Sequence, residues 1–418
     1  MRNQPTADII EQIRDIPFYR DSVARGWFPV LGKTEVARGF PDRWLTPRVT
    51  AALASGEAEF ALSAGADPGR LPFVRPPSFP LKSAYRLWST HPELAATWRE
   101  GCRRVSLTTL PVGGDLPFSA PQRTPRTPRT PQTPRTPRTH RAEEPDRRTV
   151  RVGLRVDPEQ WERGEVAGVL DELRSQQRRH PLGRYHLDGP GAQLAHLVRT
   201  AHRQGLYERF PRPASVVTAY AYTPVNVRRY LERQLACPVV DLFGDAEVGH
   251  LYSGDSGGHY RPFLDRMSVE FAPLAPGSGL HGLIVTSVRN PYMPLIRYRT
   301  GDCVRPVGPG TDAARAVRFC GRAAEVLPTP RGPVSQGDLD DCLAAVSPRI
   351  FLSQLRTTGP RETRLLYTTF DGEPLDGAES ARLADSIGEL TEFRCEIAHR
   401  TRIPIGASGK YAWLVRER

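Results

Sequence analysis

The sequence predicts an α/β fold, with layered and mainly parallel sheets in a large N-terminal domain and a small C-terminal α+β domain joined to it by a hinge. Between 215 and 244, two strand-like runs flank an amphipathic helix, which is typical of parallel sheets. The 418 residues exceed the size at which one hydrophobic core stops growing, so two domains are expected. After 319–327 the pattern changes from strand-rich to mixed helix and strand. We therefore predict a large domain at 1–322 and a small domain of ordinary size at 323–418, which the resemblance given below implies is mobile.

The elements of the first half follow from turn residues and hydrophobic periodicity. Residues 8–20 are typical of a short helix that runs into the segment IPFYR. The stretch FALSAGADPGRLPFVRPP, 60–77, predicts strand, turn and strand, because Gly65, Pro68 and Gly69 mark the turn. The remaining patterns predict helices at 162–177, 191–205 and 225–235, and strands at 215–222 and 238–244.

The second half predicts two more strands and then the elements of the small domain. RMSVEFAPL, 266–274, alternates apolar and polar residues, and HGLIVTSV, 281–288, is a further strand pattern. A capping-box pattern from Ser335 to Asp338 opens a predicted helix. The small domain then contains a helix at 335–346, a strand at 364–370 and a helix at 381–390.

The composition excludes several classes of protein. The hydrophobic fraction of 39% and charged fraction of 25% suit a globular protein, and no run approaches the roughly 18 apolar residues of a membrane span. The N-terminus lacks the apolar core of a signal peptide, so we expect a cytoplasmic protein with no membrane partner. The six cysteines are scattered without a CxxC pair, which argues against a four-thiolate zinc site and against a disulfide scaffold.

Half of the formal net charge of +12 comes from one low-complexity insert, PQRTPRTPRTPQTPRTPRTHR, at about 121–141. Its six arginines are unopposed by acids, and proline at nearly every third position denies it helix and sheet. We predict an extended, solvated linker. A basic tract can contact phosphates, but no aromatic residue interleaves this one for base stacking, so nucleic acid is not the expected partner.

Four motifs stand in a specific order along the chain: DLFGDAEVG at 241–249, PLIRYRTGD at 294–302, CGRAAEVL at 320–327 and PIGASGKYAWLV at 404–415. In PLIRYRTGD a strand-like run breaks at a glycine and then presents an acid in an otherwise basic chain. Together, the four motifs resemble the adenylate-forming superfamily, and most closely its phenylacetate–CoA ligase branch and the related capsule-biosynthesis proteins. IPFYR and KTEVARGFP, near the N-terminus, resemble the same branch.

The resemblance implies an enzyme that joins a carboxylic acid to the α-phosphate of ATP, releases pyrophosphate and passes the acyl group to coenzyme A or another acceptor. Asp302 matches the acid that binds the ribose hydroxyls, and Arg322 matches the arginine at the ribose and phosphate side where the hinge begins. Glu247 matches the acid that holds Mg²⁺ on the nucleotide. Lys410 matches the lysine of the small domain that acts in adenylation, which requires that domain to close.

The same resemblance assigns further residues to the nucleotide and the acid. Ser63 and Gly65 match the phosphate loop, and Phe243 and Gly244 match the nucleotide side of the 241–249 motif. Tyr220 lies on the adenine side, where a tyrosine can stack on a purine, and Tyr222 is a candidate wall of the acid pocket. Aromatic walls suit an aryl acid. However, aromatic residues are equally common in a core.

The sequence also departs from the family pattern. In SAGADPGR, 63–70, the loop threonines are replaced by Ala66 and Asp67, and Pro68 removes a backbone N–H that would bind phosphate. Tyr220 stands where glutamate is common, and the acidic hinge position is Ala324. These changes keep open an enzyme with an unusual acceptor, such as an amine, or an unusual oxyacid. They also keep open a degenerate homologue that binds a nucleotide or a protein partner without turnover.

The expected cofactors and partners follow from the resemblance. They are ATP, Mg²⁺, coenzyme A and a small-molecule carboxylic acid, in a specialised biosynthetic pathway. Only His259 and Cys320 remain of the metal ligands found in some members of the branch, and two ligands do not make a zinc site, so no zinc is expected. A homodimer is the default assembly.

Overall fold

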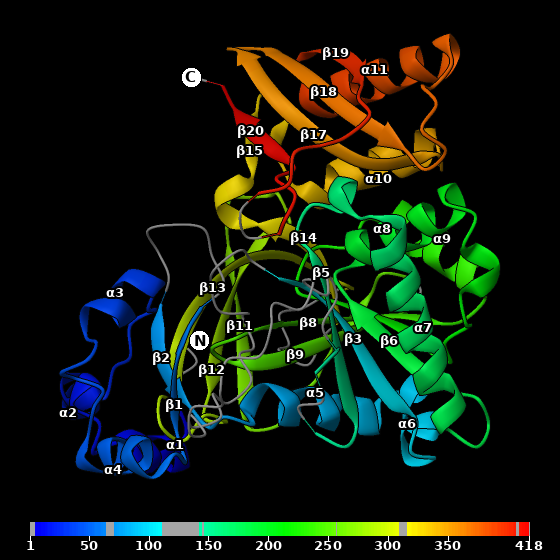
Figure 1. Ribbon diagram of the computed structural model, residues 1–418. Helices are drawn as coiled ribbons and strands as arrows, with labels where there is room; N and C mark the ends of the chain where they lie inside the picture. Colours follow the sequence, from blue (N-terminus) through cyan, green and yellow to red (C-terminus); the bar gives the residue numbers. More distant parts are fainter. Residues whose placement is uncertain are drawn as a thin grey trace, which may run out of the picture.

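This computed structural model describes residues 5–63, 71–110, 142–143, 146–255, 257–308, 316–406 and 409–417. The predicted low-complexity linker and Gly65 lie outside these ranges. Two bodies of structure stand out: a large one built on a long twisted sheet, and a smaller one that sits above it and carries the C-terminus (Figure 1). Within the described ranges, no helix is long and apolar enough to cross a membrane.

The large sheet has twelve strands in the order β11-β12-β13-β14-β10-β9-β8-β7-β6-β3-β5-β4. Its parallel half contains β3 (Arg103–Leu110), β5 (Thr149–Arg155), β6 (Tyr185–Gly189), β7 (Ser215–Ala219) and β8 (Val239–Asp245), with the short β4 (Ala142–Glu143) at the edge. Its antiparallel half contains β9 (Gly249–Gly254), β10 (Tyr260–Pro262), β11 (Met267–Pro273), β12 (His281–Ser287), β13 (Leu295–Pro306) and β14 (Val317–Arg322).

The α/β class is thus confirmed, but the large sheet is mixed rather than mainly parallel. Four of its strand pairings are parallel and seven are antiparallel. The reason lies in the connections after 245: the described segments that join these strands contain no helix, and a parallel pairing needs a crossover connection of a dozen residues or more.

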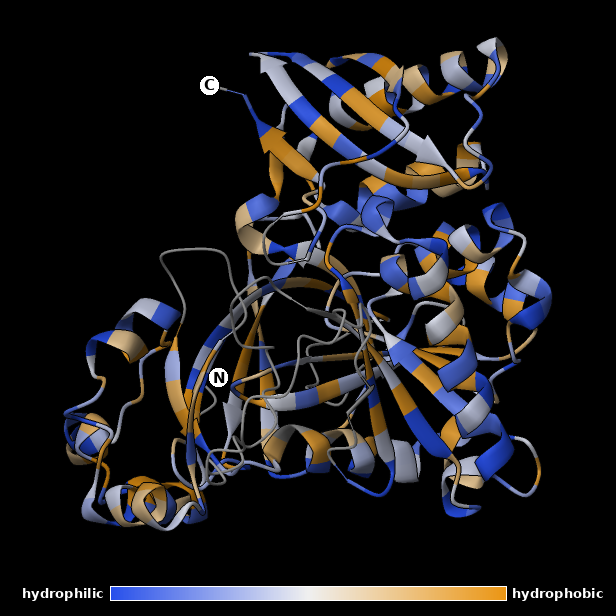
Figure 2. Cartoon of the chain, viewed as in Figure 1, coloured by the Kyte–Doolittle hydropathy of each residue, from blue (hydrophilic) through white to orange (hydrophobic). Residues whose placement is uncertain are grey.

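Helices cover both faces of the parallel half (Figure 1). On one side lie α7 (Arg163–Arg179), α8 (Gly191–Arg203) and α9 (Val225–Leu235), and on the other α5 (Phe79–Thr90) and α6 (Pro92–Arg99). Figure 2 shows apolar residues along the strands of the sheet, where these helices bury them. The predicted helices at 162–177, 191–205 and 225–235 are confirmed.

The N-terminal segment packs against the antiparallel half of the sheet. It contains α1 (Ala7–Ile13), α2 (Arg20–Arg25), α3 (Lys33–Arg38), α4 (Pro47–Ser55) and the hairpin of β1 (Glu59–Leu62) and β2 (Pro72–Arg75). Tyr19, Phe28 and Trp44 share one apolar cluster with Ile296 and Tyr298 of β13. This packing brings the start of α3 to the edge of the candidate site described below.

The smaller body contains β15 (Leu327–Thr329), β16 (Gly332–Val334), α10 (Gln336–Val346), β17 (Ile350–Gly359), β18 (Glu362–Thr369), α11 (Gly377–Thr391), β19 (Arg394–His399) and β20 (Leu414–Arg416). Its sheet has the order β19-β18-β17-β20 and its own apolar cluster, built around Leu355, Leu365 and Ile387. The predicted capping box is confirmed, because the Ser335 hydroxyl accepts from the Asp338 N–H. The domain boundary at 322 stays a prediction.

The smaller body rests on α8 and α9. The Arg199 guanidinium of α8 donates to the carbonyls of Thr369 and Phe370, each at 2.9 Å. Tyr230 of α9 stacks on Phe370 with ring centroids 4.1 Å apart. Phe351 and other apolar residues of β17 and β18 complete the cluster that fills the parallel half of the large sheet. The two bodies therefore share a core as well as a surface.

Candidate active site

The acid of the PLIRYRTGD motif lies inside β13, which continues through the glycine where the sequence predicted a break, with a register shift against β14 after Asp302. Gly301 adopts a left-handed backbone (φ +87°), which turns the strand at that point. Asp302 then faces Arg322 on the neighbouring strand β14, and Arg322 Nη1 lies 3.1 Å from Asp302 Oδ1. Burial raises the pKa of Asp302, and Arg322 opposes that shift. The second carboxylate oxygen, Oδ2, is buried and has no hydrogen-bond partner among the described residues. It can therefore accept a hydrogen bond from a donor that this part of the chain does not supply.

Glu247 lies in the turn between β8 and β9 and is 3% exposed. Its Oε1 is 3.3 Å from Lys33 Nζ, at the start of α3, and accepts a 3.3 Å hydrogen bond from the Tyr298 hydroxyl. Gly244 precedes it at a tight crossing, where an added Cβ would stand 2.4 Å from the Gly249 carbonyl oxygen. Only glycine therefore fits there, and this close strand crossing aims the Glu247 turn at β13.

Asp245, at the end of β8, adds a third carboxyl group to the site. Burial, together with the nearby Asp302 and Glu247, raises the pKa of Asp245 to about 7, and Arg322 and Lys33 oppose the shift. Its Oδ2 is buried and has no hydrogen-bond partner in the part of the chain that the structure describes. The cluster thus contains three acids and, with Lys410 described next, three cations; its members are Asp245, Glu247, Asp302, Lys33, Arg322 and Lys410.

Lys410 reaches this cluster from the smaller body. Burial and the nearby Arg322 lower the pKa of Lys410 from its usual range, whereas Asp245 and Asp302 oppose that shift. The lysine is presented by a tight turn: Gly409 has a φ of +75°, and the Gly406 N–H donates to the Lys410 carbonyl at 2.9 Å. Among the described residues, Lys410 forms no ion pair and no side-chain hydrogen bond. Its ammonium group is therefore not committed to a neighbour.

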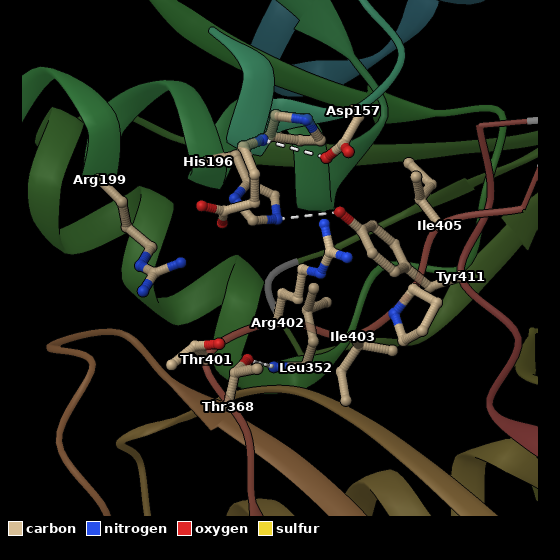
Figure 3. Close-up of a pocket in the computed structure, with 13 residues that line it drawn as sticks. Asp157, His196, Arg199, Leu352, Thr368, Thr401, Arg402, Ile403, Ile405 and Tyr411 are labelled. Atoms are coloured by element: carbon tan, nitrogen blue, oxygen red, sulfur yellow. Dashed lines mark hydrogen bonds between the residues drawn. The ribbon is translucent and has the colours of Figure 1, made fainter.

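The residue after Lys410 anchors the turn to the large body. The Tyr411 hydroxyl lies 2.9 Å from His196 Nε2 on α8, and Figure 3 shows the two side chains pointing toward each other. Burial lowers the pKa of His196, so the neutral imidazole is favoured. A cavity of about 170 Å³ lies beside this contact, between α8, the strands β17 and β18, and residues 401–405.

The structure brings together Glu247, Asp302, Arg322 and Lys410, which come from four separate sequence motifs. Sequence reasoning missed Lys33, Asp245 and Tyr298 as members of the cluster. The rarity of lysine, with only three in the chain, was the one signal that pointed to Lys33.

Other predicted residues have different surroundings. The Tyr220 hydroxyl accepts from Arg104 at 2.8 Å. Ser63 is buried, and its hydroxyl accepts from the Leu71 N–H at 2.8 Å across the hairpin. Phe243 stacks on Phe319 of β14, with ring centroids 3.6 Å apart. The assignments of these three side chains to the nucleotide stay predictions.

Tyr222 lies between the two bodies. Its hydroxyl donates to Asp340 Oδ2 of α10 at 2.9 Å, and its side chain lines a cavity of about 380 Å³ together with Tyr260 and Phe319. Its predicted role in an acid pocket remains untested, but it does border a cavity large enough for a small molecule.

The donor set of the cluster suits a nucleotide better than a dedicated metal cage. Within the described ranges, no three His, Cys, Asp or Glu residues are arranged to hold a metal ion. Mg²⁺ bound with a nucleotide needs only one or two carboxylates, because phosphates and waters supply its other ligands. Glu247 and Asp245 could supply those carboxylates, and the Asp302 Oδ2, which has no partner among the described residues, can accept from hydroxyl groups.

Comparison with known proteins supports the fold. No protein-family model and no curated protein matches this sequence. Among solved structures, 2-hydroxyisobutyryl-CoA ligase in its postadenylation state, in complex with 2-HIB-AMP, has a TM-score of 0.67 at 13% identity, over 98% of this chain and 88% of that one. An anthranilate CoA ligase in complex with anthranoyl-AMP has a TM-score of 0.55 at 14% identity, over 84% of this chain and 65% of that one. A benzoate CoA ligase from Burkholderia xenovorans has a TM-score of 0.54 at 12% identity, over 84% of this chain and 67% of that one.

The chain therefore has the fold of adenylate-forming CoA ligases, with a large N-terminal mixed sheet and a small C-terminal one. The same 2-hydroxyisobutyryl-CoA ligase in its thioesterification state, with 2-HIB-AMP and CoA, gives a lower TM-score of 0.51 at 13% identity, over 98% and 88%. At such identities the likeness concerns the fold.

Proposed function

We propose that this chain is an AMP-forming acid ligase. One oxygen of a carboxylic acid attacks the α-phosphorus of ATP, the bond to the β-phosphate breaks, and pyrophosphate leaves with the electron pair. The acyl carbon of the resulting acyl-AMP is then attacked by the thiol of coenzyme A or by another acceptor, and AMP leaves. The observation that carries the proposal is the uncommitted Lys410, delivered by the smaller body into an acidic cluster of the large one.

The carboxyl groups of the cluster would bind the nucleotide. The partnerless Oδ2 of Asp302 would accept hydrogen bonds from the ribose hydroxyls, and Arg322 fixes the orientation of that carboxylate through its 3.1 Å contact with Oδ1. Glu247 and Asp245 would hold Mg²⁺, which neutralises charge on the separating phosphates when it is bound.

The cations would act on the reacting groups. The Lys410 ammonium would attract both the attacking carboxylate and the α-phosphate, which holds them in line and stabilises the developing charge. Lys33 would place a second positive charge beside Glu247, on the phosphate side. It offers a cation close to a phosphate loop that has lost its threonine hydroxyls.

The substrate is proposed to be an aryl or small organic acid, and coenzyme A is the first acceptor to test. The neighbouring structures are described with acyl-AMP or CoA bound, which supports that choice. A second candidate function is a degenerate homologue that binds a nucleotide without turnover. The replacement of the loop threonines by Ala66 and Asp67 favours this alternative.

Pyrophosphate release distinguishes the two functions. The full chain would be incubated with ATP and Mg²⁺ over a panel of aryl and aliphatic acids, with and without coenzyme A. Release that depends on one acid supports the ligase, and a thiol requirement for multiple turnovers names the acceptor. Nucleotide binding without release for any acid would instead favour the degenerate homologue.

A further inference from the structure

A second cavity, of about 380 Å³, lies between α9 of the large body and α10 of the smaller one. Figure 1 labels both helices. It is lined on the large body by α9, by residues 257–260 and by β14, and on the smaller body by Asp341, Ala344 and Ala345 of α10. None of Asp245, Glu247, Asp302 or Lys410 lines it. Its volume lies within the range of small-molecule sites.

Arg228 of α9 is the decisive residue of this cavity. It is 6% exposed, it lines the cavity, and its guanidinium packs against Gly258, where an added Cβ would stand 3.1 Å from Nη2. No described residue accepts a hydrogen bond from this guanidinium or forms an ion pair with it. A buried arginine without a partner is costly, because its desolvation is not offset by charge-assisted hydrogen bonds.

The nearest acids already have other partners. Asp241 accepts from the Tyr260 hydroxyl, and Asp340 accepts from Tyr222 and from the Val225 N–H at 2.9 Å. Burial raises the pKa of each of these carboxyl groups to about 6, with Arg228 only a minor opposing influence. Arg228 is attracted to these two carboxyl groups and to Glu232, one turn along α9, but no described residue accepts a hydrogen bond from its guanidinium.

The rest of the lining is cationic and aromatic. Arg229 also lines the cavity without a described ion-pair partner, whereas Arg318 is paired with Asp341, with Nη2 2.7 Å from Oδ1. Two guanidinium groups without a described ion pair thus remain next to the rings of Tyr260 and Phe319, and Glu232 of α9 is an acid that attracts both. A phosphate monoester carries between one and two negative charges at neutral pH and binds in the planar fork of arginine.

We propose that this cavity binds an organic phosphate, meaning a phosphate group carried on an aromatic or heteroaromatic body, at a site separate from the Asp302 cluster. The phosphate contacts Arg228 and Arg229, and the ring lies against Tyr260 and Phe319. Because α10 forms the opposite wall, the bound ligand contacts both bodies. The proposal does not depend on the ligase activity.

The test is calorimetric titration of the full chain with phenyl phosphate, the simplest molecule that carries both features, and with phenol as the uncharged comparison. We expect phenyl phosphate to bind and phenol to bind at least tenfold more weakly. Arg228→Gln should lower the affinity for phenyl phosphate about tenfold or more, as expected for lost charge-assisted hydrogen bonds. Arg233→Gln, an exposed arginine on the same helix that does not line the cavity, should leave it unchanged.

Two further variants make the outcome unambiguous. Arg229→Gln changes an exposed side chain, so it keeps the fold and should weaken binding severalfold even if Arg228→Gln proves unstable. Asp302→Ala, in the proposed nucleotide site, should leave phenyl phosphate binding intact. The proposal would be overturned if the unmodified chain did not bind phenyl phosphate, or if Asp302→Ala abolished binding. It would also be overturned if Arg228→Gln, Arg229→Gln and Arg233→Gln bound phenyl phosphate with equal affinity.

Discussion

Replacement of Lys410 by alanine gives the sharpest test of the proposed mechanism. In the cluster, Lys33 is paired with Glu247 and Arg322 with Asp302, which leaves Lys410 as the cation without an ion pair among the described residues. Its positive charge is therefore available to the substrates. Lys410→Ala should abolish most adenylate formation while sparing acyl transfer from supplied acyl-AMP, because only the first step needs this ammonium.

The expected size of the effect follows from that geometry. Loss of one preorganised donor at a developing negative charge typically lowers the rate about 10²–10³-fold, which corresponds to roughly 2.7–4 kcal/mol. The fold should be little affected, since the lysine forms no described ion pair that its removal would break. Lys82 offers a matched control, because it is exposed on α5 and Lys82→Ala removes the same charge away from the site.

The assay is ATP–pyrophosphate exchange with the acid identified by the panel, followed by transfer from synthetic acyl-AMP. An equal loss of both half-reactions in Lys410→Ala would refute the assigned role. So would a wild-type exchange rate, or the same loss in Lys82→Ala.

Four other outcomes are expected. Asp302→Ala should weaken AMP binding about tenfold or more, because the ribose loses a charged acceptor; unchanged affinity by calorimetry would contradict this. Tyr411→Phe should slow adenylation about fivefold and spare acyl transfer, since it removes only the hydrogen bond to His196; equal slowing of both steps would argue against an anchoring role. Burial raises the pKa of Asp340 to about 6, so its protonated form favours folding below pH 4 and that contribution is lost as the pH rises through 6. Asp340→Asn should therefore raise the free energy of unfolding by up to about 3 kcal/mol relative to the unmodified chain at pH 8, but by little at pH 4. A difference between the two melting temperatures that does not depend on pH would exclude this. Deletion of 122–139 should leave turnover intact, and an inactive but folded deletion variant would show that the repeat has a function in catalysis.

Elements with clear periodicity could be predicted from the sequence, whereas three central strands could not. The helical pattern at 225–235 lies between two strand patterns, so the order strand, helix, strand could be predicted. By contrast, β3, β5 and β6 place polar residues such as Arg104, Arg151 and Asp188 between their apolar ones, and these polar residues are buried, so the strands resemble half-exposed segments in the sequence. Arg104 is tolerated inside β3 because Asp188 of β6 lies 2.5 Å away, a pairing that only the tertiary fold creates.

The candidate site was predictable where it consists of motifs and hidden where it depends on long-range contacts. Asp302 and Arg322 are recognisable from local sequence, and their pairing follows from the register of β13 with β14. Lys33 lies 214 residues before Glu247, and no local pattern links the two. Asp245 stands within a quoted motif, but its importance comes from burial beside two other acids, which a sequence does not display.

The shared apolar cluster beneath the smaller body has a consequence for cooperativity. Phe351, Leu352 and Leu366 pack in the same cluster as Val227 and Leu231 of α9. Separation of the two bodies would expose apolar area on both sides, at about 25 cal/mol for each square ångström. Slowly exchanging amide protons should therefore extend from α9 into β17 without a step in protection, and heating should melt both bodies in one transition. A fragment ending at 322 would leave this face of α9 exposed to water and prone to association.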